Sequence, residues 1–471
     1  MSEQYRLNRI EDARELVAGA GTLVPVLDGQ QVPYVNLDNA ASTPALREVL
    51  ETLNDFMGWY ASVHRGTGFK SRLSTQAYDE AHAITGRFFK ANPATNTVIF
   101  VRNTTEAVNR LANRFPFGPD DVVLSSFQEH HSNDLPWRRR AKVDYIAVND
   151  RGALELDDLE RKLRRRDGKV RLVTVTGASN VTGCVNLIHD IARLAHRWGA
   201  QVMVDGAQLA PHRAIDMRPD DDPGHIDYLT VSGHKMYAPF GTGALIGPAA
   251  TFLQGDPDLV GGGVVELVTH DQVVWTGLPD KEEAGSPNVP GAVAMARALL
   301  VLDRIGMAAV ARHEAELTAY ALRRLPEIPG LTLFGETDPT RVRDRVGVIP
   351  FAMNGLPHGL VAAILGYEGG IGVRSGCFCA HPYVLRLLRL SAAESARYQA
   401  AIMRGDRSDI PGFVRASFGL YSTPADVDRL VEMLLVIARG EFKGTYRLDA
   451  HTGAFTPEGH NPDTATYWNW D

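Results

Sequence analysis

Residues 227–243, DYLTVSGHKMYAPFGTG, decide the fold of this chain. Residues 228–231 predict a β-strand that runs into a loop punctuated by glycine. That loop carries Ser232, His234 and Lys235, and a second apolar strand follows it. A lysine in a loop is usually a solvated surface charge. Here a hydroxyl and an imidazole, three and one residues before the amine, suit a phosphate-bearing ligand whose aldehyde the amine holds as a Schiff base.

The length and composition indicate a globular protein of two domains. The chain has 471 residues, too many for one ordinary core, and it is 44% hydrophobic and 22% charged. Its net charge of −7 gives no electrostatic reason to expect nucleic acid or an anionic membrane as a partner. No apolar run approaches the roughly 20 residues of a membrane span. Because the polar start, residues 1–15, also lacks the core of a secretion signal, we expect a cytoplasmic protein with no membrane partner.

Short apolar strands alternate with helical segments along much of the chain. This alternation predicts an α/β fold with a mostly parallel, doubly wound sheet, in which ligands bind at the carboxyl ends of the strands. Beyond a loop-rich stretch, residues 255–291, strands near 346–353 and 371–374 resemble a smaller α/β domain. The strands predicted for the larger sheet are residues 97–101, 121–125, 171–176, 201–205, 228–231 and 243–247.

Helix signals lie between and after these strands. We expect a helix over residues 43–60 that Thr43 and Pro44 open, and a final helix to residue 439 with Thr423 as N-cap and Pro424 in its first turn. The polar, aromatic tail that follows gives no prediction. Further helical patterns lie at residues 75–90, 186–198, 292–328 and 358–366.

Polar groups follow the predicted strands. Thr104 and Thr105 lie just past one strand and open a helix, where free N–H groups and hydroxyls favour a phosphate. Asp205 ends another strand, where a carboxylate can keep a pyridine nitrogen protonated. Gln208 lies one helical turn later and could reach a ring hydroxyl. Taken alone, each signal also has an ordinary structural explanation, such as a helix cap.

Two further groups complete the pattern. His130, in QEHHSND, could stack on a cofactor ring and shuttle protons, although a lone histidine after a strand is more often structural. Asn180, in GASNVTG, could bind the ring oxygen or a substrate carboxylate. The order and spacing of all these groups, with SGHK at 232–235, resemble the class V aminotransferase family of pyridoxal-phosphate (PLP) enzymes. Within that family, SGHK before a glycine-rich strand is a cysteine desulfurase-type signature.

The resemblance runs from about residue 37 to residue 430 and includes LDNAAST at 37–43, VHRG at 63–66 and AGSP at 284–287. It implies PLP as cofactor and no metal. The cofactor-binding residues that it implies are Thr104, Thr105, His130, Asn180, Asp205, Gln208, Ser232, His234, Lys235 and Ser286.

The resemblance also implies an architecture. In fold type I, a large domain with a mostly parallel seven-stranded sheet is joined to a smaller α/β C-terminal domain. We expect the large domain at residues 46–300 and the small domain at 1–45 and 301–471. In the family, the residue matching Ser286 reaches the phosphate of the neighbouring subunit, which implies a homodimer with shared active sites. Ser286 stands where threonine is usual, and Lys281 where arginine is usual.

A thiol on a mobile loop separates the desulfurases of this family from its aminotransferases, and VRSGCFCAHP, residues 373–382, supplies two. Cys379 falls on the position of the catalytic cysteine of group II desulfurases, whereas Cys377 falls where they usually carry histidine. The Cys-Phe-Cys form is closer to the desulfurase domain of molybdenum cofactor sulfurases. So is the segment of about 30 residues that precedes 412–423.

Three cysteines are too few and too oddly numbered for a disulfide framework, so we expect reduced thiols. Two buried hydrophobes or half of a metal site would also explain the C-x-C pattern, but no second Cys/His pair with zinc-like spacing is evident. In an extended segment, residues two apart point the same way. We therefore expect Cys377 and Cys379 to point the same way, so that either could reach the site. The resemblance favours Cys379 as nucleophile and leaves Cys377 to receive the sulfur or to resolve the persulfide as a disulfide.

The implied reaction converts L-cysteine to L-alanine. Lys235 removes the α-proton, the Cys379 thiolate attacks the substrate sulfur, and the persulfide then passes to a sulfur-acceptor protein. The implied catalytic residues are Lys235, Cys379, His130 and Asp205, and the implied substrate-binding residues are Arg415, Arg374, Asn180 and Ala40.

Two alternatives remain open at this point. The chain could be another class V enzyme, such as an aminotransferase, epimerase, selenocysteine lyase or C–S lyase, with incidental thiols. It could also be a sulfur-relay or scaffold protein that binds PLP vestigially. Alanine and sulfide as products would distinguish a desulfurase from an enzyme that forms a keto acid or a D-amino acid.

Overall fold

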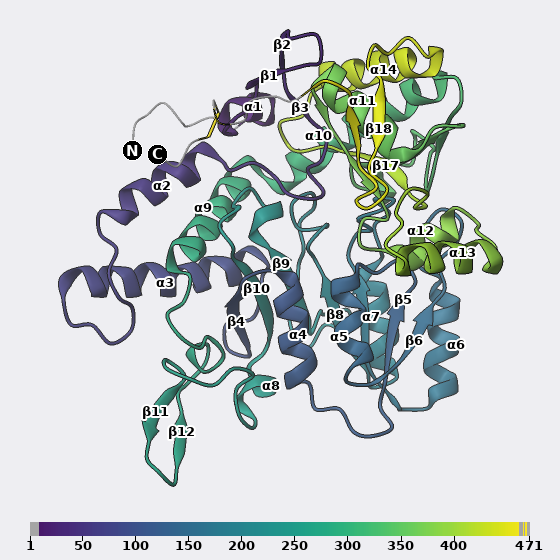
Figure 1. Cartoon of the computed structure of the whole chain (residues 1–471). Coiled ribbons are helices and arrows are strands. Elements are labelled where there is room, and N and C mark those ends of the chain that lie inside the picture. The colour runs from purple at the N-terminus through teal and green to yellow at the C-terminus, as the bar shows by residue number, and fades with distance from the viewer. Residues whose placement is uncertain (1–8, 461–464, 466, 469–471) are drawn as a thin grey trace.

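The computed structural model describes residues 9–460, 465 and 467–468, which are arranged around a seven-stranded and a four-stranded β-sheet (Figure 1). The first eight residues of the polar start lie outside the described residues. In the view of Figure 1, the larger sheet lies below the smaller one.

The larger sheet has the strand order β4-β10-β9-β8-β7-β5-β6. Strand β10 pairs antiparallel with β4 and β9, and the other neighbouring strands pair in parallel. The prediction of an α/β fold with a mostly parallel seven-stranded sheet is therefore confirmed. The strands are β4 (Asn96–Val101), β5 (Val122–Ser126), β6 (Lys142–Ile146), β7 (Val170–Thr176), β8 (Gln201–Asp205), β9 (Tyr228–Ser232) and β10 (Gly243–Pro248).

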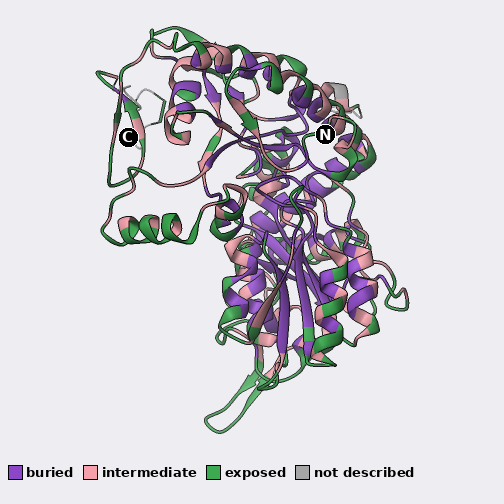
Figure 2. Cartoon of the chain, turned by 90° about the vertical axis from the view of Figure 1, so that its right-hand side faces the viewer, coloured by how far each residue is buried: buried purple, intermediate pink, exposed green. Residues whose placement is uncertain are grey.

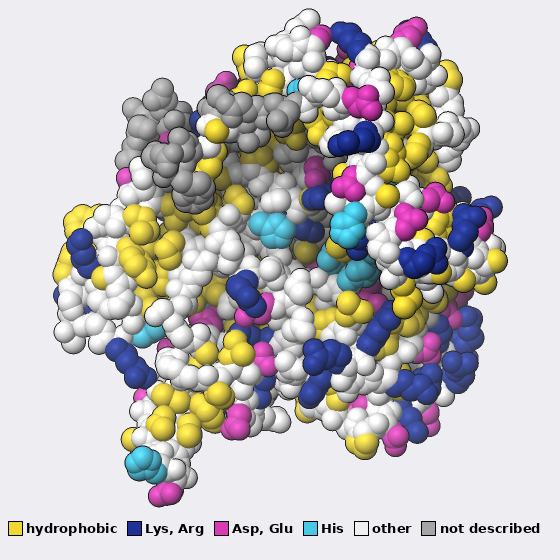
Figure 3. Space-filling view, in the orientation of Figure 1, with side chains coloured by type: hydrophobic (Ala, Val, Ile, Leu, Met, Phe, Trp, Pro, Cys, Tyr) yellow, Lys and Arg dark blue, Asp and Glu magenta, His cyan; other side chains and the backbone are white. Residues whose placement is uncertain are grey.

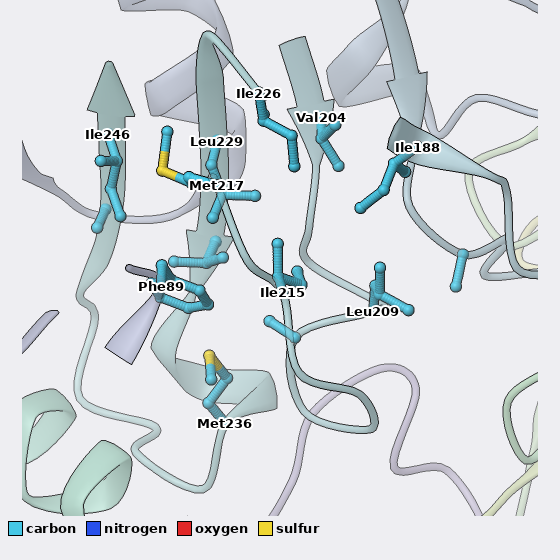
Figure 4. Packing of buried hydrophobic residues seen from close by; sticks show 14 of the residues in the cluster. Phe89, Ile188, Val204, Leu209, Ile215, Met217, Ile226, Leu229, Met236 and Ile246 are labelled. Atoms are coloured by element: carbon cyan, nitrogen blue, oxygen red, sulfur yellow. The ribbon is translucent and has the colours of Figure 1, made fainter. Parts of the chain in front are cut away.

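Both faces of this sheet are covered, because alternate residues of each strand point to opposite sides. In β8, Met203 belongs to one cluster with Trp137 of α5, whereas Val202 and Val204 belong to another with Ile191 of α7 (Figures 2 and 4). Burial on both faces explains the continuous apolar runs of the predicted strands. The helices in this part are α2 (Arg47–Met57), α3 (Phe69–Phe88), α4 (Thr104–Arg114), α5 (Leu135–Arg138), α6 (Leu156–Arg166), α7 (Ile188–Arg197), α8 (Ala249–Leu253) and α9 (Val289–Ile305).

Strand β6 is the one strand of the larger sheet whose position the sequence patterns do not indicate. It lies at the edge of the sheet beside β5, and most of its residues are only half-buried. Its sequence, KVDYI, includes two charged residues, Lys142 and Asp144. An edge strand tolerates such charges, so it lacks the apolar run that marks the inner strands.

Two predicted helix starts are wrong. Helix α2 begins at Arg47 rather than at Thr43. The hydroxyl of Thr43 instead donates to the carbonyl oxygen of His234 at 3.2 Å and accepts the N–H of Tyr237 at 2.8 Å, so this residue ties the chain to the lysine loop. Helix α3 begins at Phe69, six residues before the predicted start, and no side-chain cap marks that start.

The smaller sheet has the order β13-β14-β17-β16, and α10, α11 and α14 pack against it. Strand β3 from the N-terminal arm pairs in parallel with β15. Thr423 caps α14 in a capping box with Asp426, as predicted. The elements are β3 (Val35–Asn36), α10 (Met307–Arg324), β13 (Leu331–Leu333), β14 (Val348–Met353), α11 (His358–Gly369), β15 (Ile371–Gly372), β16 (Arg374–Gly376), β17 (Phe413–Ser417) and α14 (Pro424–Arg439).

Some boundaries differ from those expected. The helical pattern at 292–328 divides at Gly306, which ends α9 with a positive φ of 85°. The predicted strand at 371–374 is split into β15 and β16. The expected domain boundary at residue 300 falls inside α9, so the division into residues 46–300 against 1–45 and 301–471 stays a prediction.

The remaining elements are short or peripheral. The segment before β17 forms two helices, and α13 buries none of its residues. A hairpin, β11–β12, projects from the molecule and is largely exposed (Figure 2). No helix among the described residues is both long and apolar enough to cross a membrane. These elements are α1 (Ala13–Leu16), β1 (Leu23–Pro25), β2 (Gln31–Pro33), β11 (Val265–Val268), β12 (Val273–Trp275), α12 (His381–Leu387), α13 (Ala392–Met403), β18 (Tyr446–Leu448) and β19 (Phe455–Pro457).

Candidate active site

The carboxyl ends of β4, β5, β7, β8 and β9 meet at one edge of the larger sheet, where a cavity of about 450 Å³ opens. Cavities of this size are typical of small-molecule sites. All predicted site residues except Ser286 line it. They are Ala40, Thr104, Thr105, His130, Asn180, Asp205, Gln208, Ser232, His234, Lys235, Arg374, Cys379 and Arg415.

Lys235 ends a single 3₁₀ turn, Gly233–Lys235, that follows β9. Glycine is needed at position 233, because a Cβ there would lie 2.7 Å from the carbonyl oxygen of Thr242. The turn directs Lys235 into the cavity. Removal of its amine from water lowers the pKa of Lys235 to about 8, and the carboxylate of Asp205 opposes that shift.

Asp205 ends β8 and is buried, and it accepts the N–H of Ala207 at 2.9 Å. Burial raises the pKa of this carboxyl, while the charge of Lys235 opposes the change. One turn later, the side-chain nitrogen of Gln208 contacts His212 at 3.1 Å. The side-chain oxygen of Gln208 is buried and has no hydrogen-bond partner among the described residues. Such an oxygen is available to a hydroxyl on a bound molecule.

Hydroxyl groups gather at the N-terminus of α4. The backbone N–H of Thr104 donates to Oγ of Ser232 at 2.9 Å, and that hydroxyl donates to Oγ1 of Thr104, also at 2.9 Å. Oγ1 of Thr105 and Oγ of Ser132 lie 2.7 Å apart. Nearby, burial lowers the pKa of His234 to about 4. A helix start surrounded by hydroxyls suits a phosphate group.

The tautomer of His130 follows from its contacts. The backbone N–H of Ser132 donates to Nδ1 of His130 at 3.1 Å, so this nitrogen accepts and the proton lies on Nε2. Burial, together with the charge of Lys235, lowers the pKa of His130 to about 3. His130 is therefore neutral at physiological pH and presents an N–H to the cavity.

Arg415 is buried on β17 and is held on two sides. Its Nη2 pairs with Oδ1 of Asp38 at 3.0 Å, and its Nη1 donates to the backbone oxygen of Asn180 at 2.9 Å. The same Asp38 pairs with Nε of Arg374 at 3.1 Å. Burial lowers the pKa of Arg415 to about 10, against the effect of Asp38, so the guanidinium stays charged at neutral pH.

The two thiols point in different directions, so the expectation that they point the same way is wrong. Phe378 and Cys379 have positive φ angles of 51° and 54°, which ends any extended conformation. Cys379 is exposed and lines the cavity, whereas Cys377 is buried and donates its thiol proton to the carbonyl of Pro411 at 3.0 Å. Burial raises the pKa of Cys377 to about 11.

The cysteine loop is anchored to the larger sheet by two hydrogen bonds. The side-chain nitrogen of Asn180 donates to the carbonyl oxygen of Phe378 at 2.7 Å. The backbone N–H of His131 donates to the carbonyl oxygen of Cys379 at 2.8 Å. These bonds hold Phe378 and Cys379, whose backbone is in the left-handed conformation, at the cavity wall.

Several residues of the site were not predicted. Asp38 orients both arginines, and Ser132 fixes the tautomer of His130. The rings of His131 and His381 stack with centroids 4.9 Å apart beside the cysteine loop. Each lies inside or beside a motif that the sequence had singled out. The partners of Asp38 and His131 come from distant parts of the chain, whereas Ser132 acts on its near neighbour His130.

Ser286 lies apart from the other predicted residues. It lines a separate cavity with Tyr60, His64 and Arg65, among others. Within one chain, the structure does not bring this residue to the lysine site.

Comparison with known proteins identifies the family. The profile of the aminotransferase class-V family matches residues 35–430. The chain belongs to this family. The probable cysteine desulfurase of Halalkalibacterium halodurans is 36% identical to it over 425 residues, which cover 88% of this chain and 95% of that protein. The cysteine desulfurase of Dickeya dadantii is 35% identical over 448 residues, which cover 93% and 98%.

Solved structures of this family agree with the fold. The apo structure of the cysteine desulfurase from Thermococcus onnurineus has a TM-score of 0.76 and 30% identity, covering 86% of this chain and 95% of that one. The predicted family and fold type I are thereby confirmed, and with them the prediction that the chain is an enzyme.

Members of the class-V aminotransferase family depend on PLP, and the residues present fit that cofactor. Lys235 offers an amine to the aldehyde, and Asp205 offers a carboxylate to the ring nitrogen. The unpaired oxygen of Gln208 is suited to the ring hydroxyl. The hydroxyls at the start of α4 are suited to the phosphate.

The geometry predicts unequal reactivity of the three thiols. We expect iodoacetamide at pH 8 to modify Cys379 first, because Cys377 and Cys184 are buried. With a pKa of about 11, only about one in a thousand Cys377 thiols is ionised at that pH. Peptide mapping by mass spectrometry after short exposure measures the order. All three should react alike in guanidinium chloride, and faster modification of Cys377 in the folded protein would contradict the loop geometry.

Proposed function

We propose that this protein is a PLP-dependent cysteine desulfurase that converts L-cysteine to L-alanine and retains the sulfur on Cys379 as a persulfide. The observation that carries the proposal is the presence of an exposed thiol in the same cavity as Lys235 and Asp205. An aminotransferase needs the amine and the carboxylate but not the thiol. The two similar proteins align with this chain over 95% and 98% of their own lengths, and their names, probable cysteine desulfurase and cysteine desulfurase, support the proposal.

Several residues would hold the cofactor through the contacts already described. They are Thr104, Thr105, His130, Asn180, Asp205, Gln208, Ser232, His234 and Lys235. When bound, PLP supplies an electron sink for negative charge that develops at the substrate carbon. The neutral His130, with its proton on Nε2, is suited to donate a hydrogen bond rather than to act as a cation.

Arg415 would bind the substrate carboxylate. Its two terminal nitrogens already have partners in Asp38 and Asn180, but its Nε is buried without a hydrogen-bond partner among the described residues. A buried charged donor without an acceptor is costly, so a carboxylate at this position would be stabilised. Arg374, which is half exposed at the same cavity, provides a second positive charge, and Ala40 lines the wall.

Lys235 is suited to accept the α-proton at Nζ. With a pKa of about 8, about a quarter of such amines are unprotonated at pH 7.5, against about one in a thousand for an ordinary lysine. The lowered pKa therefore makes this side chain a competent base near neutral pH.

The sulfur step would form one bond and break one. The thiolate of Cys379 attacks the substrate sulfur, and an S–S bond forms while the bond between the substrate's Cβ and sulfur breaks. The electron pair of the broken bond stays on the carbon, which takes up a proton and becomes the methyl group of alanine. One sulfur atom moves and no external oxidant is needed. Because Cys379 is exposed, a thiol on an acceptor protein could then collect the sulfur.

We also infer a homodimer with shared active sites. Ser286 lies outside the lysine cavity of its own chain, in a second cavity beside the exposed hairpin β11–β12. Exposed apolar side chains lie on this hairpin, on α2, at the start of α3 and in the loop between these two helices (Figure 3). They include Met57, Trp59, Phe69, Leu267, Val268, Val273 and Val274. Large exposed apolar patches mark protein interfaces.

We further propose a cytoplasmic location for this protein. Its three cysteines are free thiols, which suits a reducing compartment such as the cytoplasm.

Lys235 is expected to hold the cofactor. After loading with PLP and reduction with borohydride, the label should map to Lys235. The Lys235→Ala variant should remain unlabelled, whereas Lys281→Ala, which removes another buried lysine, should label normally. Because the pKa of Lys235 is lowered to about 8, the rate of PLP capture should rise about tenfold per pH unit below 8 and level off above it. A rate that still rises in this way above pH 9, or a label elsewhere, would contradict the assignment.

Cys379 is expected to carry the sulfur. Cys379→Ser should lower alanine release from cysteine by on the order of 100-fold or more, because no nucleophile remains in the cavity. Cys377→Ser should reduce it only several-fold, since that thiol is buried and turned away. Mass spectrometry after one turnover should find the added sulfur on Cys379, and the cofactor spectrum of both variants should match the wild type. Sulfur found on Cys377 alone would refute the mechanism.

Subunit mixing tests the shared site. In a mixed dimer of Lys235→Ala and Ser286→Asp protomers, one site would combine an intact Lys235 with an intact Ser286 of the partner subunit. We expect this mixed dimer to recover about half of the wild-type activity. Each variant alone should be inactive, because Lys235→Ala lacks the amine that holds the cofactor and the aspartate in Ser286→Asp repels a phosphate. If Ser286 acted within its own chain, both sites would be defective and no activity would return.

A further inference from the structure

Three metal-ligand side chains converge at the edge of the larger sheet opposite the lysine cavity. His196 lies near the end of α7, and His225 and Asp227 lie just before β9. One ligand atom from each of the three lies within 4.8 Å of the other two. Among the described residues, this is the one group of three or more such side chains that close together. The catalytic assignments leave it without a role.

Hydrogen bonds orient both imidazoles. Nδ1 of His196 lies 2.8 Å from the carbonyl oxygen of Pro223, and Nδ1 of His225 lies 2.7 Å from that of Asp222. A carbonyl oxygen only accepts, so both Nδ1 atoms carry protons and both Nε2 atoms are left to bind a cation when the rings are neutral. A backbone carbonyl at the second ring nitrogen is the usual arrangement behind a metal-bound histidine.

Both Nε2 atoms face the carboxylate of Asp227. The Nε2 of His196 lies 2.9 Å from Oδ2, and that of His225 lies 3.6 Å from Oδ1. Asp227 also accepts the N–H of Val202 at 2.7 Å and the side chain of Gln201 at 3.1 Å. These two donors favour the charged form of the carboxylate. The carboxylate is thus available as an anion.

The backbone of this group is fixed by packing. Ile226, between His225 and Asp227, is buried and points into the core toward Val204 and Leu229 (Figure 4). Because side chains alternate along an extended segment, the residues on either side of Ile226 are turned to the other side. The core therefore sets the positions of two of the three ligands.

We propose that His196, His225 and Asp227 form a binding site for one divalent cation of the zinc class. Two imidazole nitrogens and one carboxylate oxygen are a donor set that zinc uses with bound water in the fourth position. In a tetrahedral site with bonds of about 2.0–2.1 Å, neighbouring ligand atoms lie roughly 3.3 Å apart. The Nε2 atoms lie 2.9 Å (His196, to Oδ2) and 3.6 Å (His225, to Oδ1) from the carboxylate, close to that value, and a turn of the carboxylate would bring both to a single oxygen. Partial exposure of both histidines leaves water free to complete the coordination.

The alternative to a metal is a carboxylate flanked by protonated rings. The imidazole rings of His196 and His225 stack with centroids 4.2 Å apart and planes 22° apart. Two positive charges at such a short distance repel each other. A single dication between the rings and Asp227 removes this repulsion, because both rings are then neutral. Binding requires the two stacked rings to turn toward a common point.

The position of the site gives it a stabilising role. It joins α7 to the segments that begin β8 and β9, and these strands end in Asp205 and in the loop of Lys235. The five residues of each strand separate the three-residue group from the lysine cavity by about 16 Å. We therefore expect the cation to hold the strands without taking part in the reaction.

The test uses PLP-loaded protein and Zn²⁺ as the probe. Isothermal titration should find one Zn²⁺ per protomer at this site. The substitutions His225→Gln and His196→Gln should each lower the affinity for Zn²⁺ by about tenfold or more. The matched control is His189→Gln. His189 lies on the same helix, and its Nδ1 contacts the carbonyl of Gly224 at 2.8 Å, but it is not part of the three-residue group. Its removal should leave the affinity for Zn²⁺ within about twofold of the wild-type value.

A measurement on the wild-type protein guards against variants that fail to fold. Zinc-edge X-ray absorption with one equivalent of Zn²⁺ should show only nitrogen and oxygen neighbours at about 2.0–2.1 Å. Sulfur at about 2.3 Å would place the ion on a cysteine and overturn the proposal. So would an absence of binding, or equal affinity in His225→Gln and the wild type.

Discussion

The structure depends on holding the amine of Lys235 out of bulk water beside the buried carboxylate of Asp205. Moving a charge out of water costs several kcal/mol unless an opposite charge is fixed nearby. The parallel sheet meets this condition, because β8 and β9 are neighbours and their register pairs Asp205 with Thr230. Both strands end at the same edge, so the two charged groups reach one cavity from adjacent positions. Gly233 then allows the tight turn that aims the lysine inward.

The second half of the site comes from the other sheet. Arg415 lies on β17, and the loop after β16 carries Cys379, so substrate and sulfur chemistry are brought to a cofactor site built elsewhere in the chain. Asn180 links the two parts, since its side chain donates to Phe378 and its carbonyl oxygen accepts from Arg415. The positive φ angles at Phe378 and Cys379 are what separate an exposed thiol from a buried one two residues away.

Local signals predicted much of this arrangement, and long-range contacts account for what they missed. Strands buried on both faces gave clear apolar runs, and groups such as Asp205 are marked by their place at a strand end. Thr43 has the local sequence of a helix start, but its hydroxyl binds the lysine loop nearly 200 residues later. The role of Asp38 depends on Arg415, and the cluster of His196, His225 and Asp227 forms only when α7 meets β9. No spacing rule detects such pairs.

The charges in and beside the cavity favour anionic ligands. Lys235, Arg374 and Arg415 line it with three positive charges, and Asp205 lines it with one negative charge. Asp38, which pairs with both arginines, carries a second negative charge, so one positive charge is left in excess. In a partly enclosed space of low dielectric constant, such an excess attracts anions more strongly than it would in water. A phosphate at the start of α4 and a carboxylate at Arg415 would reverse this imbalance. Asp38 offsets part of the charge of both arginines, while the Nε of Arg415 has no hydrogen-bond partner among the described residues and is left for a ligand.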